Sequence, residues 1–268
     1  MRYPLLEVQS RLCTGKFSFR RFAICLVPLG ALALGACTTG TPAGPGEFND
    51  PYENTNRKIH SFNKSMDTGI YRPVSNAYGT VVPIAVRTGV NNVSETIDLP
   101  RRVVNSLLQG DVETGVHNTF RFLLNATLGV AGIFDPATSF GVEERDTDFG
   151  ETLHVWGVGE GAYLAVPFFG PSNQRDLAGD VVDLVTNPLS YVLTPPQSYV
   201  GPGSTLGENA DYRYTFQDTV DGILYDSADS YAQSRVIYLE SRRFELGIPS
   251  GGGTGEAEDD IFDPYEDF

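Results

Sequence analysis

Apolar residues recur three, four and seven positions apart through the first half of the chain, between residues 54 and 124. This spacing predicts amphipathic helices, each with one apolar face. The expected faces are Ile59, Phe62 and Met66; Val74, Ala77, Tyr78 and Val81; Val86, Val90, Val93 and Ile97; Val103, Val104, Leu107 and Leu108; and Val112, Val116, Phe120, Leu123 and Leu124. Such faces either pack on one another or lie in a membrane interface, and the pattern leaves both open.

Residues that commonly begin a helix precede each of these faces. They are Asn54, Pro73, Pro83, Asp98 with Pro100, and Asp111. Gly110 is suited to end the fourth helix, because glycine accepts the left-handed backbone found after many helices. The first half of the chain therefore predicts five consecutive helices.

The pattern changes between residues 127 and 172, where glycines interrupt the apolar residues. Residues 152–156 and 162–166 resemble extended segments, so we expect irregular structure with short strands. Helical spacing returns after Ser172, and this helix should point Leu177, Val181, Val182 and Val185 inward and end near Asn187.

A loop and two helices complete the expected elements. Proline, glycine and serine predict a loop over 190–206, and helices are expected over 208–222 and 227–246. Gly247 is suited to end the last helix. The predicted fold class is mainly α, with a glycine-rich irregular and short-strand segment.

The first 36 residues have the organisation of a secretory signal peptide. Five basic residues and one acid precede an uncharged, mostly apolar run from Phe22 to Ala36. This run of 15 residues is shorter than the roughly 20 that a transmembrane helix needs. We therefore expect residues 1–36 to be removed.

The leader ends in Leu34, Gly35, Ala36 and Cys37, which resembles the lipobox of bacterial lipoproteins. In such proteins the cysteine carries a diacylglycerol and a further acyl chain after cleavage, and no other cofactor is expected here. Thr38 follows the cysteine, which by the sorting pattern of these lipoproteins implies the outer membrane. Cys37 would be the only cysteine of the mature chain, so no internal disulfide can form.

The charge of the chain excludes some partners. Removing five bases and one acid with the leader leaves 14 basic and 33 acidic residues, a net charge of −19. A nucleic-acid partner needs a basic surface and is excluded on this ground. Attachment to a membrane must therefore come from acyl chains, at about 0.8 kcal/mol per buried CH₂, and from apolar side chains.

The two ends of the mature chain differ in composition from its body. Residues 37–47 read as an acylated N-terminus and flexible tether, and 48–247 as the folded domain. Residues 248–268 form an acidic tail that we expect to be disordered. The alternative is a docking peptide with Phe262, Tyr265 and Phe268 as its anchors.

No motif requires catalysis or a metal. Gly157, Gly159 and Ala162 match a dinucleotide-binding pattern in letters only, because Pro167 follows too soon for the required helix. The three histidines, His60, His117 and His154, have no metal-binding spacing, and no serine lies in a nucleophile elbow. Asp146, Asp148, Asp176 and Asp180 could form carboxylate pairs, but we interpret them as a solvated face or helix caps.

A series of short motifs in residues 48–245 resembles the MlaA (VacJ) family of outer-membrane lipoproteins. The matching segments are Asp50-Pro-Tyr-Glu53, Asn56-Arg57, Phe62-Asn63, Arg72-Pro73, Leu107-Leu-Gln-Gly-Asp111, Arg121-Phe122, Asn125, Leu128-Gly129, Phe149-Gly150, Thr152-Leu153, Gly157-Val-Gly159, Gly161, Tyr163-Leu164, Pro167, Gly170-Pro171, Arg175-Asp176 and Gly179. They occur in the order typical of that family. The long leader and the acidic tail depart from it.

The resemblance implies a ring-like bundle of helices around a central amphipathic channel, embedded in the inner leaflet of the outer membrane on its periplasmic side. It implies removal of mislocalised phospholipid from the outer leaflet and transfer to a periplasmic carrier protein of an ABC-transporter pathway, which maintains lipid asymmetry. It also implies association with trimeric porins and no enzymatic activity.

Under this resemblance, the candidates for channel-lining or hinge residues are Phe62, Asn63, Gly129, Gly132, Gly157, Gly159 and Gly161. Two other functions remain open. One is a structural adaptor lipoprotein that binds porins without moving lipid. The other is a periplasmic hydrolase, which would release fatty acid from lipid.

Replacing Cys37 by Ala should block processing and release the protein from the outer-membrane fraction, because no acyl chain can then be attached. The apparent mass and membrane fractionation of the variant report this. Cys25→Ala is the matched control, since it also removes a cysteine, but one that lies within the leader, before the cleavage site. Unchanged processing of the Cys37→Ala protein would contradict acylation.

Overall fold

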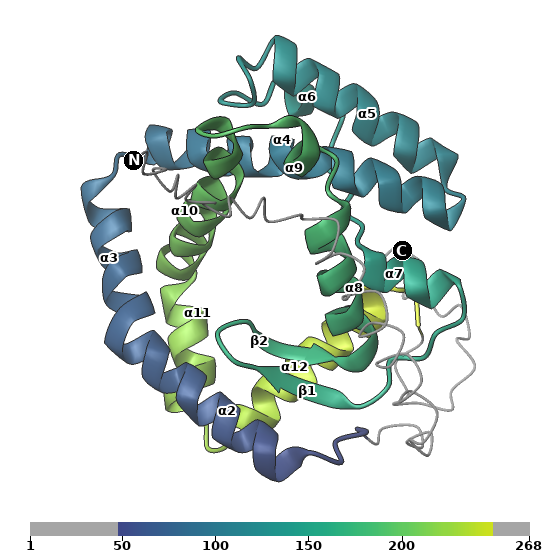
Figure 1. Cartoon of the computed structure of the whole chain (residues 1–268). Helices are drawn as coiled ribbons and strands as arrows, with labels where there is room; N and C mark the ends of the chain where they lie inside the picture. Colours follow the sequence, from purple (N-terminus) through teal and green to yellow (C-terminus); the bar gives the residue numbers. More distant parts are fainter. Residues whose placement is uncertain (1–47, 249–268) are drawn as a thin grey trace, which may run out of the picture. The chain divides into compact units, whose positions relative to one another are not determined.

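Helices make up most of the computed structural model, which describes residues 48–248 (Figure 1). The longer helices are α2 (Glu53–Met66), α3 (Arg72–Val81), α4 (Ile84–Gln109), α5 (Val112–Thr127), α8 (Gln174–Thr186), α10 (Val200–Thr215) and α12 (Ser230–Glu245). Shorter helical pieces are η2 (Asp67–Tyr71), α6 (Pro136–Ser139), α7 (Phe149–Val155), α9 (Leu189–Val192), η3 (Gln197–Tyr199), α11 (Gln217–Asp221) and η4 (Gly222–Asp226). The mainly α prediction is confirmed.

Several predictions concern residues outside the described part of the chain. These are the signal peptide, the lipobox with Cys37, the tether and the acidic tail from residue 249 onward. They stay predictions.

Helices α2 and α3 are joined by the π-helical η2, and the backbone keeps helical angles at both junctions. Pro73 lies in the first turn of α3, as predicted. The prediction that Asn54 caps α2 is wrong, because the helix already begins at Glu53. Tyr52 occupies the cap position and makes no side-chain cap hydrogen bond.

Helix α4 continues through Asp98 and Pro100, where the sequence predicted the start of a new helix. A proline inside a helix costs about 3 kcal/mol. The helix remains whole because Leu99 and Arg102, on either side, are buried where α4 packs against its neighbours. Gly110 ends α4 with a φ of +80°, and Asp111 caps α5 by accepting from the Thr114 N–H at 3.0 Å, both as predicted.

Strands β1 (Tyr163–Val166) and β2 (Gly170–Asn173) form an antiparallel hairpin in which Tyr163 pairs with Asn173 and Val166 with Gly170. The extended prediction for residues 162–166 is thus confirmed. The extended prediction for 152–156 is wrong, because most of that segment belongs to α7. The Asp148 side chain accepts from the Glu151 N–H at 2.7 Å, and this cap starts the helix.

The loop predicted over 190–206 is shorter than expected, because α10 already begins at Val200. One of its glycines, Gly207, allows close packing of the helix. A Cβ on Gly207 would lie 2.7 Å from the Val90 Cγ1 atom of α4, so only glycine allows this approach. The end of α12 agrees with the prediction, since Gly247 follows it with a φ of +65°.

The interior of the described region is mostly polar. More polar than apolar side chains are buried, and a small apolar cluster consists of Tyr163, Tyr231 and Leu239 with Phe48 and Tyr238 packed against it. The prediction that α8 points Val181 and Val185 inward is wrong, while Leu177 and Val182 are half-buried. Val181 and Val185 are 48% and 45% exposed, whereas α8 buries Arg175, Asp176, Gly179 and Asp183.

Contacts between the elements form a closed circuit (Figure 1). The circuit runs from α2 through η2, α3, α10, α4, α7, α8, β2 and β1, and β1 contacts α2 again. Helix α5 packs on α4, and α6 packs on α5. Helices α5 and α6 therefore join the circuit at α4. Helix α12 contacts β2 and η4.

The two π-helical segments meet at a buried ion-pair cluster. Arg213 of α10 donates to both carboxylate oxygens of Asp67 in η2, at 2.9 and 2.8 Å. Its Nη2 also donates to Asp221 at 2.6 Å, and the Tyr225 hydroxyl of η4 donates to Asp67 at 2.7 Å. Burial raises the pKa of Asp67, but Arg213 and Tyr225 outweigh this and lower it overall.

Replacing Arg213 by Met should lower the free energy of unfolding by about 3–5 kcal/mol, because Asp67 loses its bidentate partner in a buried site. Thermal unfolding should shift down by about 6–20 °C. Arg57→Met is the control, since Arg57 also pairs with two carboxylates, Glu53 and Asp229, but is exposed. Its effect should stay under about 1 kcal/mol. Equal losses in both variants would contradict the assignment.

Candidate functional site

Helix α5 presents its apolar side chains to the outside. Val112, Val116, Phe120 and Leu123 are 52–64% exposed. The opposite face buries Gly115, Asn118, Arg121 and Asn125. Soluble proteins place these two faces the other way round. Of the two alternatives left open by the sequence, this arrangement favours a helix that lies in an apolar surrounding.

The buried face of α5 is held by hydrogen bonds. Arg121 donates to Asp135 at 2.9 Å and to the Thr138 hydroxyl at 3.0 Å. The Asn125 side chain accepts from the Ala137 N–H at 3.1 Å, and Asn118 donates to the Arg145 carbonyl at 3.0 Å. These bonds attach α5 to α6 and to the loop after it. The apolar face is thus left largely exposed.

The turn after α5 continues the exposed apolar surface. Its exposed apolar side chains are Leu128, Val130, Ile133 and Phe134, and Phe140 follows after α6. Two of the predicted candidates, Gly129 and Gly132, lie here and are buried. A Cβ on Gly129 would lie 2.3 Å from the Phe134 carbonyl oxygen, and Gly132 has a φ of +89°. Both glycines therefore shape the turn that displays these side chains.

Together these side chains make a large apolar surface, of the kind that marks contact with a membrane or another protein. In the part of the chain from 48 to 248, no helix is long and apolar enough to cross a membrane. The apolar surface is instead spread over the outer faces of several amphipathic helices.

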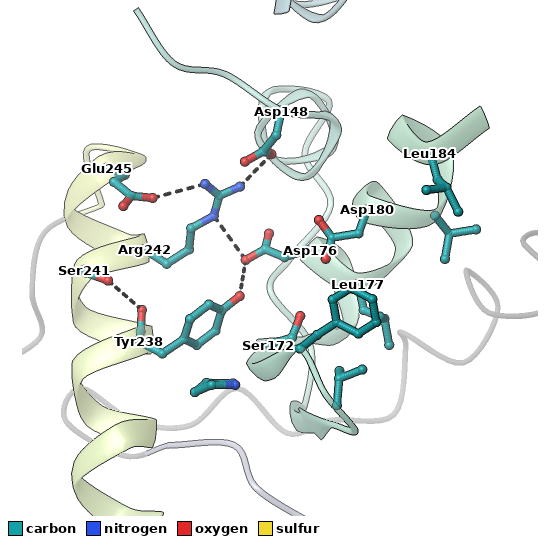
Figure 2. A pocket seen from close by; sticks show the side chains of 14 residues that line it. Asp148, Ser172, Asp176, Leu177, Asp180, Leu184, Tyr238, Ser241, Arg242 and Glu245 are labelled. Atoms are coloured by element: carbon teal, nitrogen blue, oxygen red, sulfur yellow. Dashed lines mark hydrogen bonds and ion pairs between the residues drawn. The ribbon is translucent and has the colours of Figure 1, made fainter. Parts of the chain in front are cut away.

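A cavity of about 520 Å³ lies between α8, α12 and the β1–β2 hairpin (Figure 2). Its lining side chains divide by chemistry into an apolar set, named here the apolar wall, and a polar set, named the polar wall. The apolar wall consists of Val166, Phe169, Pro171, Leu177, Val181 and Leu184. The polar wall consists of Asp148, Ser172, Asp176, Asp180, Tyr238, Ser241, Arg242 and Glu245. The site suits a ligand that has an apolar and a charged part.

Arg242 organises the polar wall (Figure 2). It donates to Asp148 at 2.7 Å, to Asp176 at 3.1 Å and to Glu245 at 3.1 Å. The Tyr238 hydroxyl adds a bond to Asp176 at 2.7 Å. Burial raises the pKa of Asp176, but Arg242 and the other partners lower it overall. Asp176 is therefore held as a carboxylate by its partners.

Asp180 differs from the other carboxylates of the wall. It forms no hydrogen bond or ion pair with another described side chain. Loss of solvent and the neighbouring Asp148, Asp176 and Asp183 raise its pKa to about 6, and Arg242 opposes this only in part. Asp180 is the carboxylate of this wall whose charge is least compensated by the protein.

Two predicted residues, Phe62 and Asn63, hold the hairpin that borders the cavity. Asn63 of α2 donates to the Val166 carbonyl at 2.9 Å and accepts from the Phe168 N–H at 2.9 Å. The Phe62 ring packs edge-on against Phe168, with ring centroids 5.3 Å apart. Neither residue lines the cavity. They act on it through the position of the hairpin.

The remaining glycine candidates lie in the segment between α7 and β1. Gly157 and Gly161 have φ values of +88° and +72°, which favour glycine, and a Cβ on Gly159 would meet open space. None of the three lines the cavity. The structure thus gives Gly157 and Gly161 a role in turn geometry, and their role as hinges stays a prediction.

The sequence pattern does not predict that most residues of the polar wall lie together. Tyr238 and Arg242 lie about 60 residues or more from Asp148 and Asp176, their partners at α7 and α8, so no local spacing connects them. Asp148 is a helix cap, as expected. The interpretation of Asp176 as part of a solvated face is wrong, since it is buried among its partners.

The histidines are scattered, and no group of three possible ligands in residues 48–248 is arranged for a metal ion. The His60 Nε2 atom is 3.0 Å from the Ser230 hydroxyl, and the His117 Nε2 atom is 2.6 Å from the Glu143 carbonyl oxygen. Burial lowers the pKa of His154. Each histidine thus has a local structural environment rather than a shared site.

Comparisons with known proteins agree on one family. The family model of the MlaA lipoprotein matches residues 48–245. The Escherichia coli (strain K12) and Shigella flexneri proteins named intermembrane phospholipid transport system lipoprotein MlaA are each 36% identical to this chain over 233 residues. Each comparison covers 84% of this chain and 89% of the relative.

The Haemophilus influenzae protein of the same name is 30% identical, over 81% of this chain and 88% of its own. A solved structure from work on the "structural basis for maintenance of bacterial outer membrane lipid asymmetry" is also similar. It shares 32% sequence identity and a TM-score of 0.64, over 74% of this chain and 98% of that one.

Replacing Phe120 by Asp should weaken binding to phospholipid vesicles at least about tenfold, because an exposed apolar contact becomes a charge. Co-sedimentation with vesicles measures this in a Cys37→Ala background, which removes the acyl anchor. Thr219→Asp is the control, since it adds the same charge to exposed α11. The helix should remain folded because Phe120 is exposed. Undiminished binding by the Phe120→Asp protein would show that this face does not meet lipid.

Proposed function

The chain belongs to the MlaA lipoprotein family, and from this premise we propose that it removes mislocalised phospholipid from the outer leaflet of the outer membrane. The lipid would pass through an amphipathic channel to a periplasmic carrier protein of an ABC-transporter pathway. The effect would be to maintain the lipid asymmetry of the outer membrane. Relatives named as phospholipid transport lipoproteins support this role.

The observation that carries the proposal is the amphipathic cavity between α8, α12 and the hairpin. A phospholipid joins apolar chains to a charged headgroup, and the two walls of the cavity offer a surface for each. A cavity of about 520 Å³ would hold part of a phospholipid at a time, which suits passage better than storage.

The exposed apolar faces support a position within one leaflet. Phospholipid tails can cover Val116, Phe120 and Leu123 of α5, while Asn118, Arg121 and Asn125 of the same helix are buried. The acyl groups on Cys37 would anchor the protein to the inner leaflet, on the periplasmic side. Buried polar groups that are satisfied within the protein are what a lipid surrounding demands.

The closed circuit of elements supports a channel enclosed by them. The circuit joins α2, α3, α10, α4, α7, α8 and the hairpin, and the cavity is formed by two of its members with α12. The protein would supply a path and no chemical step. The carboxylates Asp148 and Asp176 are bound to Arg242, so they are not placed as a free acid and base.

Trimeric porins are the proposed partners in the membrane. The exposed aromatic side chains Phe134 and Phe140, beside α5, offer a surface for a membrane protein as well as for lipid. The alternative function, a structural adaptor that binds porins without moving lipid, uses the same surface. The test therefore has to separate porin binding from lipid movement.

In a strain that lacks this gene, outer-leaflet phospholipid should rise, and the wild-type protein should reverse the rise. Leu184→Trp should fail to reverse the rise, because the larger side chain at this lining position narrows the cavity. Phe244→Trp is the matched control, since this exposed side chain of α12 does not line the cavity.

Porin co-purification with the Leu184→Trp protein separates the two functions. Retained binding with lost lipid removal would establish transport. Full reversal of the rise by Leu184→Trp would remove the cavity from the path. No rise in the deletion strain, in the absence of a redundant pathway, would leave the adaptor function in its place.

A further inference from the structure

We propose that the cavity selects phospholipids with an ammonium headgroup, and that the Asp180 carboxylate receives the ammonium. The inference rests on the proposed function, because it assumes that the cavity takes phospholipid. It adds a preference among headgroups. The reasons are the placement of the two walls, the charge of the polar wall and the state of Asp180.

The two walls orient a lipid in one direction. Val181 and Leu184 lie on the exposed face of α8 and continue the apolar wall outward. Acyl chains would lie along them. The headgroup would then meet the polar wall at Asp180, which precedes Val181 on the same helix (Figure 2).

The polar wall has an excess of negative charge. Four carboxylates line it, those of Asp148, Asp176, Asp180 and Glu245, against one cation, Arg242. The guanidinium is already occupied, because it donates to three of the four carboxylates. A phosphate without a compensating cation would be repelled here. A headgroup that carries an ammonium brings that cation itself.

Of the four carboxylates of the polar wall, Asp180 is the one that Arg242 does not bond and that can still accept a hydrogen bond from a headgroup. Arg242 reaches Asp148, Asp176 and Glu245 but makes no hydrogen bond to Asp180. The nearby carboxylates also raise the pKa of Asp180, which is the effect expected of a site that lacks a cation. A primary ammonium has three N–H donors, so it can bond to Asp180 and neutralise its charge at once.

The preferred ligand class is therefore phosphatidylethanolamine, and phosphatidylglycerol and cardiolipin should be disfavoured. A charge-assisted hydrogen bond supports a difference of about tenfold in binding between the two classes. The apolar wall does not distinguish them, since their acyl chains are alike.

The experiment uses the full-length acylated protein in detergent. It is equilibrated with mixed micelles that hold equal amounts of phosphatidylethanolamine and phosphatidylglycerol with the same acyl chains. The protein is then re-purified, and mass spectrometry measures the ratio of the two bound lipids. The wild-type protein should enrich phosphatidylethanolamine about tenfold over the input.

Asp180→Asn should abolish most of that enrichment while the total bound phospholipid changes little. Asp180→Lys should reverse it and favour phosphatidylglycerol. Asp218→Asn is the control, because it removes an exposed carboxylate of α11 that is remote from the lining residues. Thermal unfolding checks that each variant is folded.

The outcomes separate this inference from the proposed function. Phospholipid bound at the input ratio by the wild-type protein overturns the headgroup preference and leaves the transport proposal intact. Enrichment that survives in both Asp180 variants overturns the role of Asp180. No phospholipid bound by the wild-type protein overturns both proposals.

Discussion

Buried ion pairs and side-chain amides, rather than a large apolar core, hold the described elements together. Arg121 and Arg213 are 2% and 4% exposed, and each reaches carboxylates on another element. Taking such ions out of water costs several kcal/mol, so the pairs require close and complete bonding. The arrangement is understandable if the apolar faces of the helices are reserved for lipid. The interior must then be built from the polar side chains that remain.

Side-chain amides also fix the position of the hairpin, and the hairpin in turn borders the cavity. Within residues 48–248 no further strand lies beside the outer edge of β1, so its backbone groups need other partners. Asn56 and Asn63 supply them from α2: each amide donates to one strand carbonyl and accepts from one N–H. The backbone of Asn49 accepts from the Tyr163 N–H at 2.8 Å. Side-chain amides thus attach the hairpin to a helix.

The parts of the fold that the sequence predicted depend on local interactions. Asp111 caps its helix through a residue three positions away, and Gly110 and Gly247 end helices by their own backbone freedom. The sequence predictions are wrong where contacts between residues far apart in the chain determine the structure. Helix α4 passes through Pro100 because its flanks are buried, and Gly207 of α10 allows close packing on α4. The inward prediction for Val181 follows a rule for soluble proteins. The ion pairs of Arg242 with Asp148 and Asp176 have no local pattern.

A cavity with one charged and one apolar wall suits passage only if its hold on the lipid is limited. A ligand must bind well enough to enter and weakly enough to leave. Arg242 contributes to this balance by neutralising Asp148 and Asp176 within the protein, which leaves Asp180 as the open partner for a headgroup. Leu177 and Leu184 offer tails a surface much like the membrane they leave, so the chains gain little by staying. The polar wall would then govern which lipid enters, and the apolar wall would let it move on.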